Sequence, residues 1–163
     1  MSDPRPLDDY EEKLLENVAK RGFQVTTVTA GEDFPLFSYS IGFPATVGQG
    51  EVIAVGLHHM TAYDVIDRIF ARCRDGMALG DDLILADVLG DYPVVVKAIP
   101  VTAITRDRFN SAMWFHKRHF GTPLIRAYQL VWPCATTRLY PWDAECPEGV
   151  ISSQPLIYQS SIH

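Results

Sequence analysis

Aromatic, amide and small hydroxyl side chains gather in three short segments of this 163-residue chain. Tyr and Trp join a large apolar surface to a polar group, a combination that small-molecule pockets and protein interfaces both use. We therefore predict a non-catalytic binding module that recognises a small molecule or a peptide in an aromatic-lined cleft. The candidate ligand-binding residues are Ser38, Tyr39, Ser40, Gln129, Trp132, Trp142 and Asp143.

The last three of these residues also have a structural interpretation. Trp132 would end a core strand, and Asp143 would cap a backbone N–H in a turn from which Trp142 fixes the C-terminal tail. Prolines next to both tryptophans would send the chain off the sheet before it returns. We expect the tail to dock near Tyr39, on the strand face that carries the small residues Ser38, Ser40 and Gly42.

A second class of function, a small hydrolase-type enzyme, stays open as an alternative. Acid–base chemistry would come from side chains that titrate or donate protons, and the candidates are Tyr39, His58, His59 and Asp143. A nucleophile would have to be Ser38, Ser40 or Cys134. No G-x-S-x-G turn exposes either serine, so the sequence specifies no catalytic residue.

Metal and cofactor signatures are weak. His116 and His119 fall three residues apart on a predicted helix, and His58 or His59 would complete a three-nitrogen zinc site. The positive charges of Lys117 and Arg118 between them disfavour a divalent cation, and the aspartates at 81, 82, 87 and 91 lack an EF-hand pattern. With no phosphate-binding glycine loop either, we predict neither a metal nor a cofactor.

The charge balance bears on partners. With 14 Lys and Arg against 20 Asp and Glu, the net charge is −6, the opposite of what non-specific nucleic-acid binding requires. An acidic inhibitor or immunity-type protein that binds a basic partner is a second alternative, and a homodimer also stays open. Three cysteines without a C-x-x-C pair, no secretory signal and no apolar run of about 20 residues predict a soluble cytoplasmic protein.

The elements that must position these residues follow from hydrophobic periodicity. We predict helices at about 7–21, 61–75 and 107–120, the second with a capping box of Thr61 and Asp64. Strands are predicted at about 23–28, 37–43, 52–57, 83–89, 93–104 and 125–132, with a flexible loop over 44–50. The fourth and fifth strands form a hairpin. The chain is thus predicted to be one α+β domain over residues 1–163, a mainly antiparallel sheet with about three packed helices and an extended C-terminal tail.

Four motifs in order resemble the DUF4262 family of uncharacterised bacterial proteins. They read FSYSIGF from residue 37, EVIAVGL from residue 51, YQLVWPC from residue 128 and LYPWD from residue 139. The resemblance covers about residues 22–156. Cys134 stands where the family usually has an acid, and Gln49-Gly50 replaces a usual His-Pro. Because the family has no assigned function, the resemblance implies a fold and no reaction.

Overall fold

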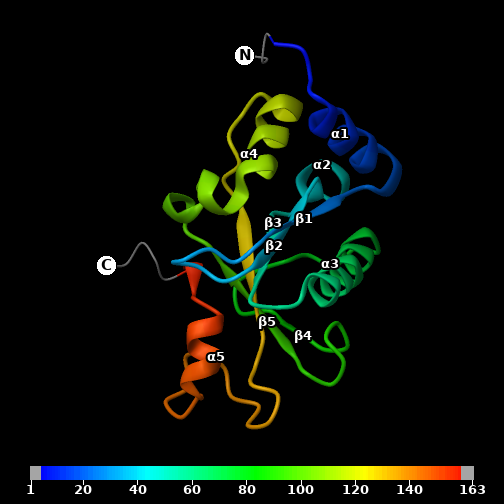
Figure 1. Ribbon diagram of the computed structural model, residues 1–163. Coiled ribbons are helices and arrows are strands. Elements are labelled where there is room, and N and C mark those ends of the chain that lie inside the picture. Colours follow the sequence, from blue (N-terminus) through cyan, green and yellow to red (C-terminus); the bar gives the residue numbers. More distant parts are fainter. Residues whose placement is uncertain (1–4, 159–163) are drawn as a thin grey trace.

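A six-stranded sheet with helices on both faces forms the body of the protein. The computed structural model describes residues 5–158 and is shown in Figure 1. The strands are β1 (Gln24–Val28), β2 (Phe37–Ile41), β3 (Glu51–Val55), β4 (Ile84–Leu85), β5 (Val94–Ala98) and β6 (Ala127–Val131). The helices are α1 (Asp9–Arg21), α2 (Phe43–Val47), α3 (His59–Arg74), α4 (Arg106–Phe120) and α5 (Glu148–Ser153), with a 3₁₀ turn at Val101–Ala103.

The sheet confirms the predicted fold class. Its strand order is β1-β2-β3-β6-β5-β4, so β1 and β4 are the two edges. All neighbouring strands pair antiparallel except β3 and β6, which run parallel. The chain between β3 and β6 is long enough for α3, the β4–β5 hairpin and α4, as a parallel connection requires.

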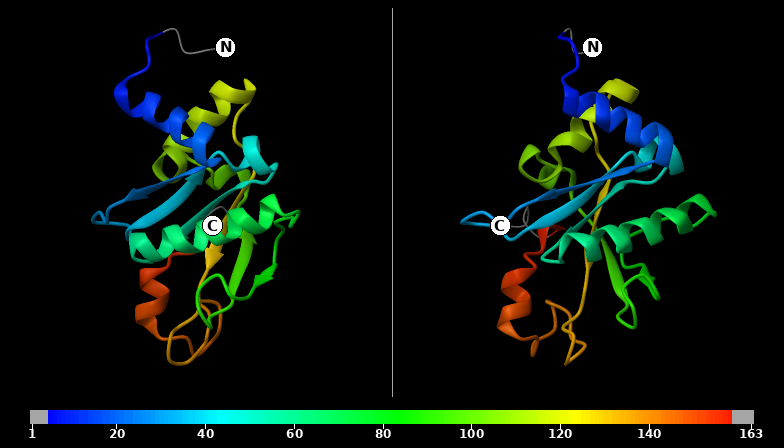
Figure 2. Two further views of the ribbon diagram at one scale, coloured as in Figure 1. Left: turned by 90° about the vertical axis from the view of Figure 1, so that its right-hand side faces the viewer. Right: turned by 45° about the vertical axis from the view of Figure 1, so that its right-hand side comes forward.

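Side chains alternate between two cores, one on each face of the sheet. The first core holds Phe37, Tyr39 and Ile41 of β2 together with residues of α1, α4 and the C-terminal tail. The second holds Val52 and Ala54 of β3 beneath α3. In both views of Figure 2, α1 and α4 lie on one side of the sheet and α3 lies on the other. This arrangement follows from the period of two in a strand, which sends neighbouring side chains to opposite faces.

Several elements differ from the predictions. The C-terminal tail, predicted to be extended, contains α5, and the strands predicted at 83–89 and 93–104 are shorter, as β4 and β5. The structure places the N-cap of α3 at His58, whose Nδ1 accepts from the Met60 N–H, so the predicted capping box of Thr61 and Asp64 is wrong. The predicted loop over 44–50 instead begins with the short helix α2, because Gly42 turns the chain at φ 110° and Pro44 suits a first helical turn. The capping box of α1, made by Asp8 and Glu11, forms as two reciprocal hydrogen bonds.

Helix α4 is kinked near its start. Phe109 has φ −134° and ψ 28° and is fully buried, with its ring edge-on to Tyr39. The Ser111 N–H donates to the Tyr39 hydroxyl at 3.0 Å, and the Ser111 Oγ lies 2.8 Å from the Tyr10 hydroxyl. The hydroxyl of Tyr39 thus accepts a hydrogen bond from a backbone N–H just after the kink. Two tyrosines consequently fix α4 to β2 and to α1.

The C-terminal tail is held on the sheet by two buried amide side chains. Gln154 accepts from the Trp132 N–H and donates to the Trp132 carbonyl, both at 2.8 Å, as a neighbouring strand would. Gln129 of β6 accepts from the Ile157 N–H at 2.6 Å and donates to the Pro155 carbonyl at 2.8 Å. The tail is therefore paired to β6 and its extension.

The face on which the tail docks differs from the prediction. Ile157 packs in the same core as Tyr39, so the tail lies on the aromatic face of β2 and not on the face of Ser38 and Ser40. The reason is that α3 already covers the apolar core on the serine face, whereas the aromatic face offers Ile157 apolar contacts. A close approach of backbone does occur, at Gly56, where an added Cβ would meet the Ser153 carbonyl oxygen at 2.1 Å.

Candidate functional site

The predicted binding residues on β2 and β6 lie inside the protein. Ser38, Ser40 and Gln129 are fully buried and Tyr39 is 2% exposed. Each side chain has a partner within the fold, because Ser38 pairs with the Thr27 hydroxyl and Ser40 donates to Glu51. None of these four residues lines either of the two cavities described below. Their role in binding a ligand stays a prediction, and their role in the structure is to join strands and tail.

Glu51, which the sequence analysis does not single out as a site residue, is the most unusual ionisable group. Its carboxylate is fully buried and accepts from the Ser40 hydroxyl at 2.7 Å, the Gly42 N–H at 2.7 Å and the Phe43 N–H at 3.2 Å. Burial raises the pKa of Glu51 to about 8, although these three donors lower it. No cation is paired with it within the described residues. Glu51 holds the turn between β2 and α2 closed.

Trp132, Trp142 and Asp143 lie around the C-terminal segment. The indole N–H of Trp132 donates to the Val55 carbonyl at 2.8 Å, and Asp143 accepts from the Tyr140 N–H at 2.7 Å, which confirms the predicted cap. Trp142 is 41% exposed and stacks on Tyr140, with ring centroids 5.1 Å apart. Of the two tryptophans, therefore, Trp132 carries the contact to the sheet.

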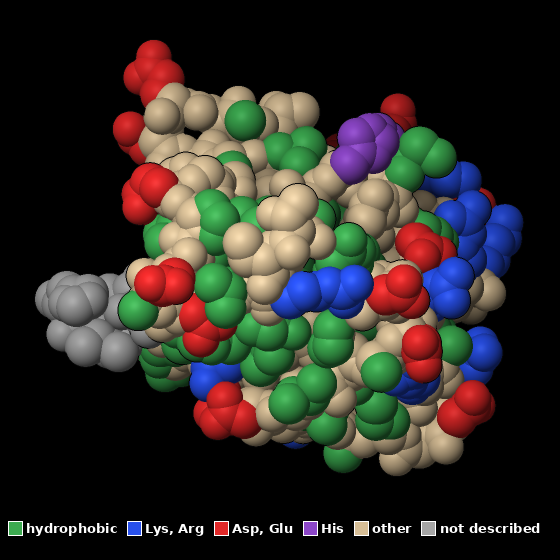
Figure 3. Space-filling view, turned by 90° about the horizontal axis from the view of Figure 1, so that it is seen from below, with side chains coloured by type: hydrophobic (Ala, Val, Ile, Leu, Met, Phe, Trp, Pro, Cys, Tyr) green, Lys and Arg blue, Asp and Glu red, His purple; other side chains and the backbone are tan. Residues whose placement is uncertain are grey.

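Trp142 has a second neighbour in the cation of Lys97. The Lys97 Nζ lies 5.9 Å from the Trp142 ring and 5.1 Å from the ring of Tyr158. Lys97 also forms ion pairs with Asp81 and Asp82, so its charge is already balanced. Seen from below, acidic and basic side chains are interspersed over this end of the molecule (Figure 3). Such a surface gives no preference for a ligand of one charge.

The histidines do not form a common cluster. His58 and His59 stack on each other at 4.3 Å at the start of α3, and the His116 Nδ1 lies 2.8 Å from the Thr122 carbonyl near the end of α4. Across residues 5–158 no group of three or more His, Cys, Asp or Glu side chains has a metal-binding arrangement. In the same part of the chain, no helix combines the length and the apolar character needed to cross a bilayer.

Two of the three free cysteines differ sharply in acidity. Hydrogen bonds from Thr136 and Thr137 lower the pKa of the Cys134 thiol to about 6, and burial raises that of Cys73 to about 11. Cys134 is buried, and its Sγ lies 3.4 Å from the Thr136 hydroxyl; no histidine of residues 5–158 is hydrogen-bonded to it.

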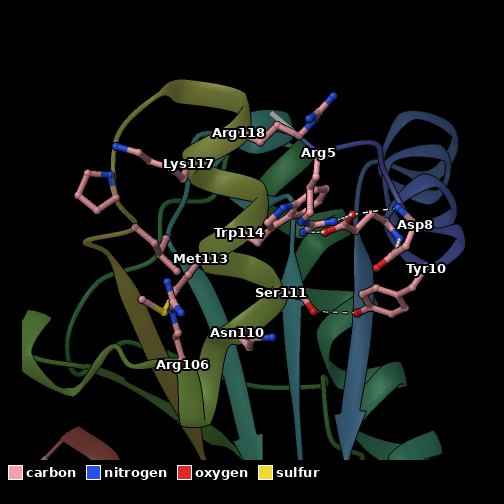
Figure 4. Close-up of a pocket in the computed structure, with 13 residues that line it drawn as sticks. Arg5, Asp8, Tyr10, Arg106, Asn110, Ser111, Met113, Trp114, Lys117 and Arg118 are labelled. Atoms are coloured by element: carbon pink, nitrogen blue, oxygen red, sulfur yellow. Dashed lines mark hydrogen bonds and ion pairs between the residues drawn. The ribbon is translucent and has the colours of Figure 1, made fainter. Parts of the chain in front are cut away.

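A cavity of about 770 Å³ forms a groove between the start of α1 and the outer face of α4. Figure 4 shows Trp114 projecting from α4 toward α1 and Arg5. Half-buried Met113 and Trp114 and buried Leu124 supply its apolar lining. Arg106 and Asn110 line one end and Lys117 and Arg118 the other. Together with Met113 and Trp114 they follow spacings of three or four residues, which keep one helical face toward the groove. Its volume is in the range of small-molecule sites.

The charges around this groove are unevenly balanced. Arg5 forms a two-bond pair with Glu11, at 2.7 and 2.6 Å, and this pairing is the main cause that lowers the pKa of Glu11 to about 2. Arg106, Lys117 and Arg118 form no ion pair with a carboxylate of residues 5–158. Arg118 lies over the Trp114 ring at 5.8 Å. Within residues 5–158, the groove of this acidic protein thus carries three cations outside any salt bridge, together with Asp8 and Glu11, which also line it.

Comparison with known proteins gives a family and no function. A family model described as a domain of unknown function, DUF4262, matches residues 17–147. The chain belongs to the DUF4262 family. No curated protein and no solved structure has significant similarity to it. The match confirms the resemblance of the four motifs, and it leaves the site of this DUF4262 protein to be argued from its geometry.

The groove of the DUF4262 protein shows what sequence reasoning missed. The basic pair Lys117 and Arg118 is visible in the sequence, where its charge disfavours zinc but does not by itself indicate a groove. A helical projection of α4 would have placed Met113, Trp114 and Lys117 on one stripe. The opposite wall, contributed by Arg5 and α1, depends on long-range packing and has no local signal.

Proposed function

We propose that this DUF4262 protein is a binding module for a small organic anion with an aromatic or apolar part. The observation that carries the proposal is the groove between α1 and α4, where three cations that form no ion pair with a carboxylate of residues 5–158 border an apolar floor. The anionic group would lie at Lys117 and Arg118, and the apolar part would cover Trp114 and Met113. Arg106 and Asn110 would contact the far end of an elongated ligand.

The chemistry of the groove favours an anion over a neutral or cationic ligand. Arg offers a planar set of donors that matches carboxylate and phosphate, and Lys adds a point charge. An indole ring with a guanidinium over it accepts a second flat group by stacking. Because the side chains of Arg106, Lys117 and Arg118 are exposed, each should contribute modestly to the binding free energy. The affinity should fall as the ionic strength rises.

A matched set of small probes tests this proposal by calorimetry at low ionic strength. Phenyl phosphate carries ring and charge, inorganic phosphate lacks the ring, benzyl alcohol lacks the charge, and benzylamine reverses it. We expect phenyl phosphate to bind most tightly and benzylamine not at all. Lys117→Ala and Arg118→Ala should each weaken phenyl phosphate by about three- to tenfold.

The matched control is Lys13→Ala, which removes the same charge from the exposed face of α1, where Lys13 pairs with Glu16. If Lys13→Ala weakened binding as much as Lys117→Ala, the effect would reflect net charge alone and the site would be wrong. Equal binding of all four probes would contradict the proposal as well.

The three free thiols lead us to propose, in addition, a reducing compartment such as the cytoplasm for the native protein.

A further inference from the structure

The two edges of the sheet are built differently. Edge strands expose unpaired backbone N–H and C=O groups, and proteins usually shield them by short length, charge, proline or a bulge. Strand β4 follows this rule, since it has two residues and begins just after Asp81 and Asp82. Strand β1 does not, because it has five residues, reads QVTTV and pairs with β2 without a bulge.

The outer side of β1 is open within the described residues. Its backbone forms the ladder with β2, and no other backbone hydrogen bond of residues 24–28 joins it to another segment of 5–158. No charged residue occurs from Gly22 to Gly31. Figure 2 shows α1 and α3 on opposite sides of the sheet, which leaves the margin of the sheet between them.

Exposed apolar side chains border this edge. Val25 and Thr27, which point to the same face of β1, line a cavity of about 300 Å³ together with His59, Met60 and Tyr63 of α3. Met60 is 68% exposed and Tyr63 is 40% exposed. Val28, at the end of the strand, is 38% exposed. The outer side of β1 thus combines unpaired backbone groups with exposed apolar side chains beside them.

We propose that β1 pairs antiparallel with β1 of a second copy of this chain, so that the sheet continues across a two-fold axis. A two-fold axis places the same patch on both sides, so Met60 and Tyr63 would meet apolar side chains of the partner copy. The uncharged strand is what makes self-pairing tolerable in a chain of net charge −6, since no like charges face each other there. This surface is separate from the groove between α1 and α4.

The interface is small. A five-residue ladder with a few apolar side chains belongs to the weak class of interfaces, so we expect a dissociation constant on the order of micromolar. Sedimentation of the full chain over a range of concentrations should show a reversible monomer–dimer equilibrium. Hydrogen exchange of the backbone amides in β1 should slow as the protein concentration rises.

Two substitutions and one control test the position of the interface. Val28→Lys and Met60→Lys add a charge at exposed positions beside the edge, and each should weaken the dimer at least about tenfold. The control Ile84→Lys adds the same charge to the other edge, at a side chain that is 65% exposed, and should leave the dimer unchanged. Circular dichroism and thermal unfolding verify that each variant folds like the wild type.

Three outcomes would overturn the proposal. The first is a chain that stays monomeric at every concentration. The second is a dimer that Ile84→Lys weakens as much as Met60→Lys does. The third is a dimer in which the β1 amides exchange as fast as they do in the monomer, which would place the contact elsewhere on the surface.

Discussion

Replacing Glu51 by Gln tests whether burial or hydrogen bonding controls the ionisation of the central carboxyl group. The pKa of Glu51 is about 8 in the folded protein and has an ordinary value of 4.5. The difference corresponds to about 5 kcal/mol. It means that the cost of burying a carboxylate exceeds the help of three donors, Ser40 and the two N–H groups of α2.

The sign of the pH dependence follows from this difference. Between about pH 4.5 and pH 8 the folded protein keeps the proton of Glu51, and the unfolded chain loses it. The stabilisation from this group is complete below about pH 4.5 and is lost as the pH rises toward about 8. Of the total, about 4 kcal/mol should be lost between pH 5 and pH 9.

The assay is urea unfolding of the wild type and of Glu51→Gln at several pH values from 5 to 9. Glutamine does not titrate, and every other group is common to both proteins, so the difference between their unfolding free energies isolates Glu51. We expect the wild type to lose about 4 kcal/mol relative to Glu51→Gln across this range. A constant difference would refute the reasoning, because it would mean that the three donors keep the carboxylate ionised in the folded state throughout.

Three further predictions concern the tail and the thiols. Gln154→Ala leaves the N–H and carbonyl of Trp132 without their partner and should lower the free energy of unfolding in urea by about 2–4 kcal/mol. Proteolysis of the tail should also become faster. An unfolding midpoint equal to that of the wild type would contradict this pairing. Gly56→Ala should lower the free energy of unfolding by about 2 kcal/mol or more, because φ is +84° and the new Cβ meets the Ser153 carbonyl. A thermal midpoint equal to that of the wild type would show that the tail moves aside without cost. Iodoacetamide followed by mass spectrometry should label Cys134 before Cys73 at pH 7, with an apparent pKa near 6 for Cys134; equal labelling would show that access, not acidity, controls both.

Much of the fold was accessible from the sequence because its signals are local. The stripe of α3 and the alternation of β2 depend on neighbours within one element, and both elements form. The short helix α2 was missed because its apolar residues cover barely one turn. The kink of α4 was missed because the residue that contacts it, Tyr39, is distant in sequence.

The candidate site was harder to predict for the same reason. Conspicuous residues such as Gln129 and Trp132 are explained by the docking of the tail, since a buried amide must find partners and the tail backbone supplies them. The groove depends instead on ordinary residues of two helices that meet only in the folded protein. Composition and motif order therefore indicated the family and the architecture, and packing determines the groove.

The central claim is that the groove at α4 receives the anion, and the three tryptophans provide its most direct test. Trp114 lines the groove, and Trp132 and Trp142 lie at the C-terminal segment. In a titration with phenyl phosphate followed by nuclear magnetic resonance of the indole N–H groups, we predict that the Trp114 signal moves and saturates while the other two stay in place. Movement of the Trp132 or Trp142 signal with Trp114 unchanged would contradict the account and return the site to the seam between tail and sheet.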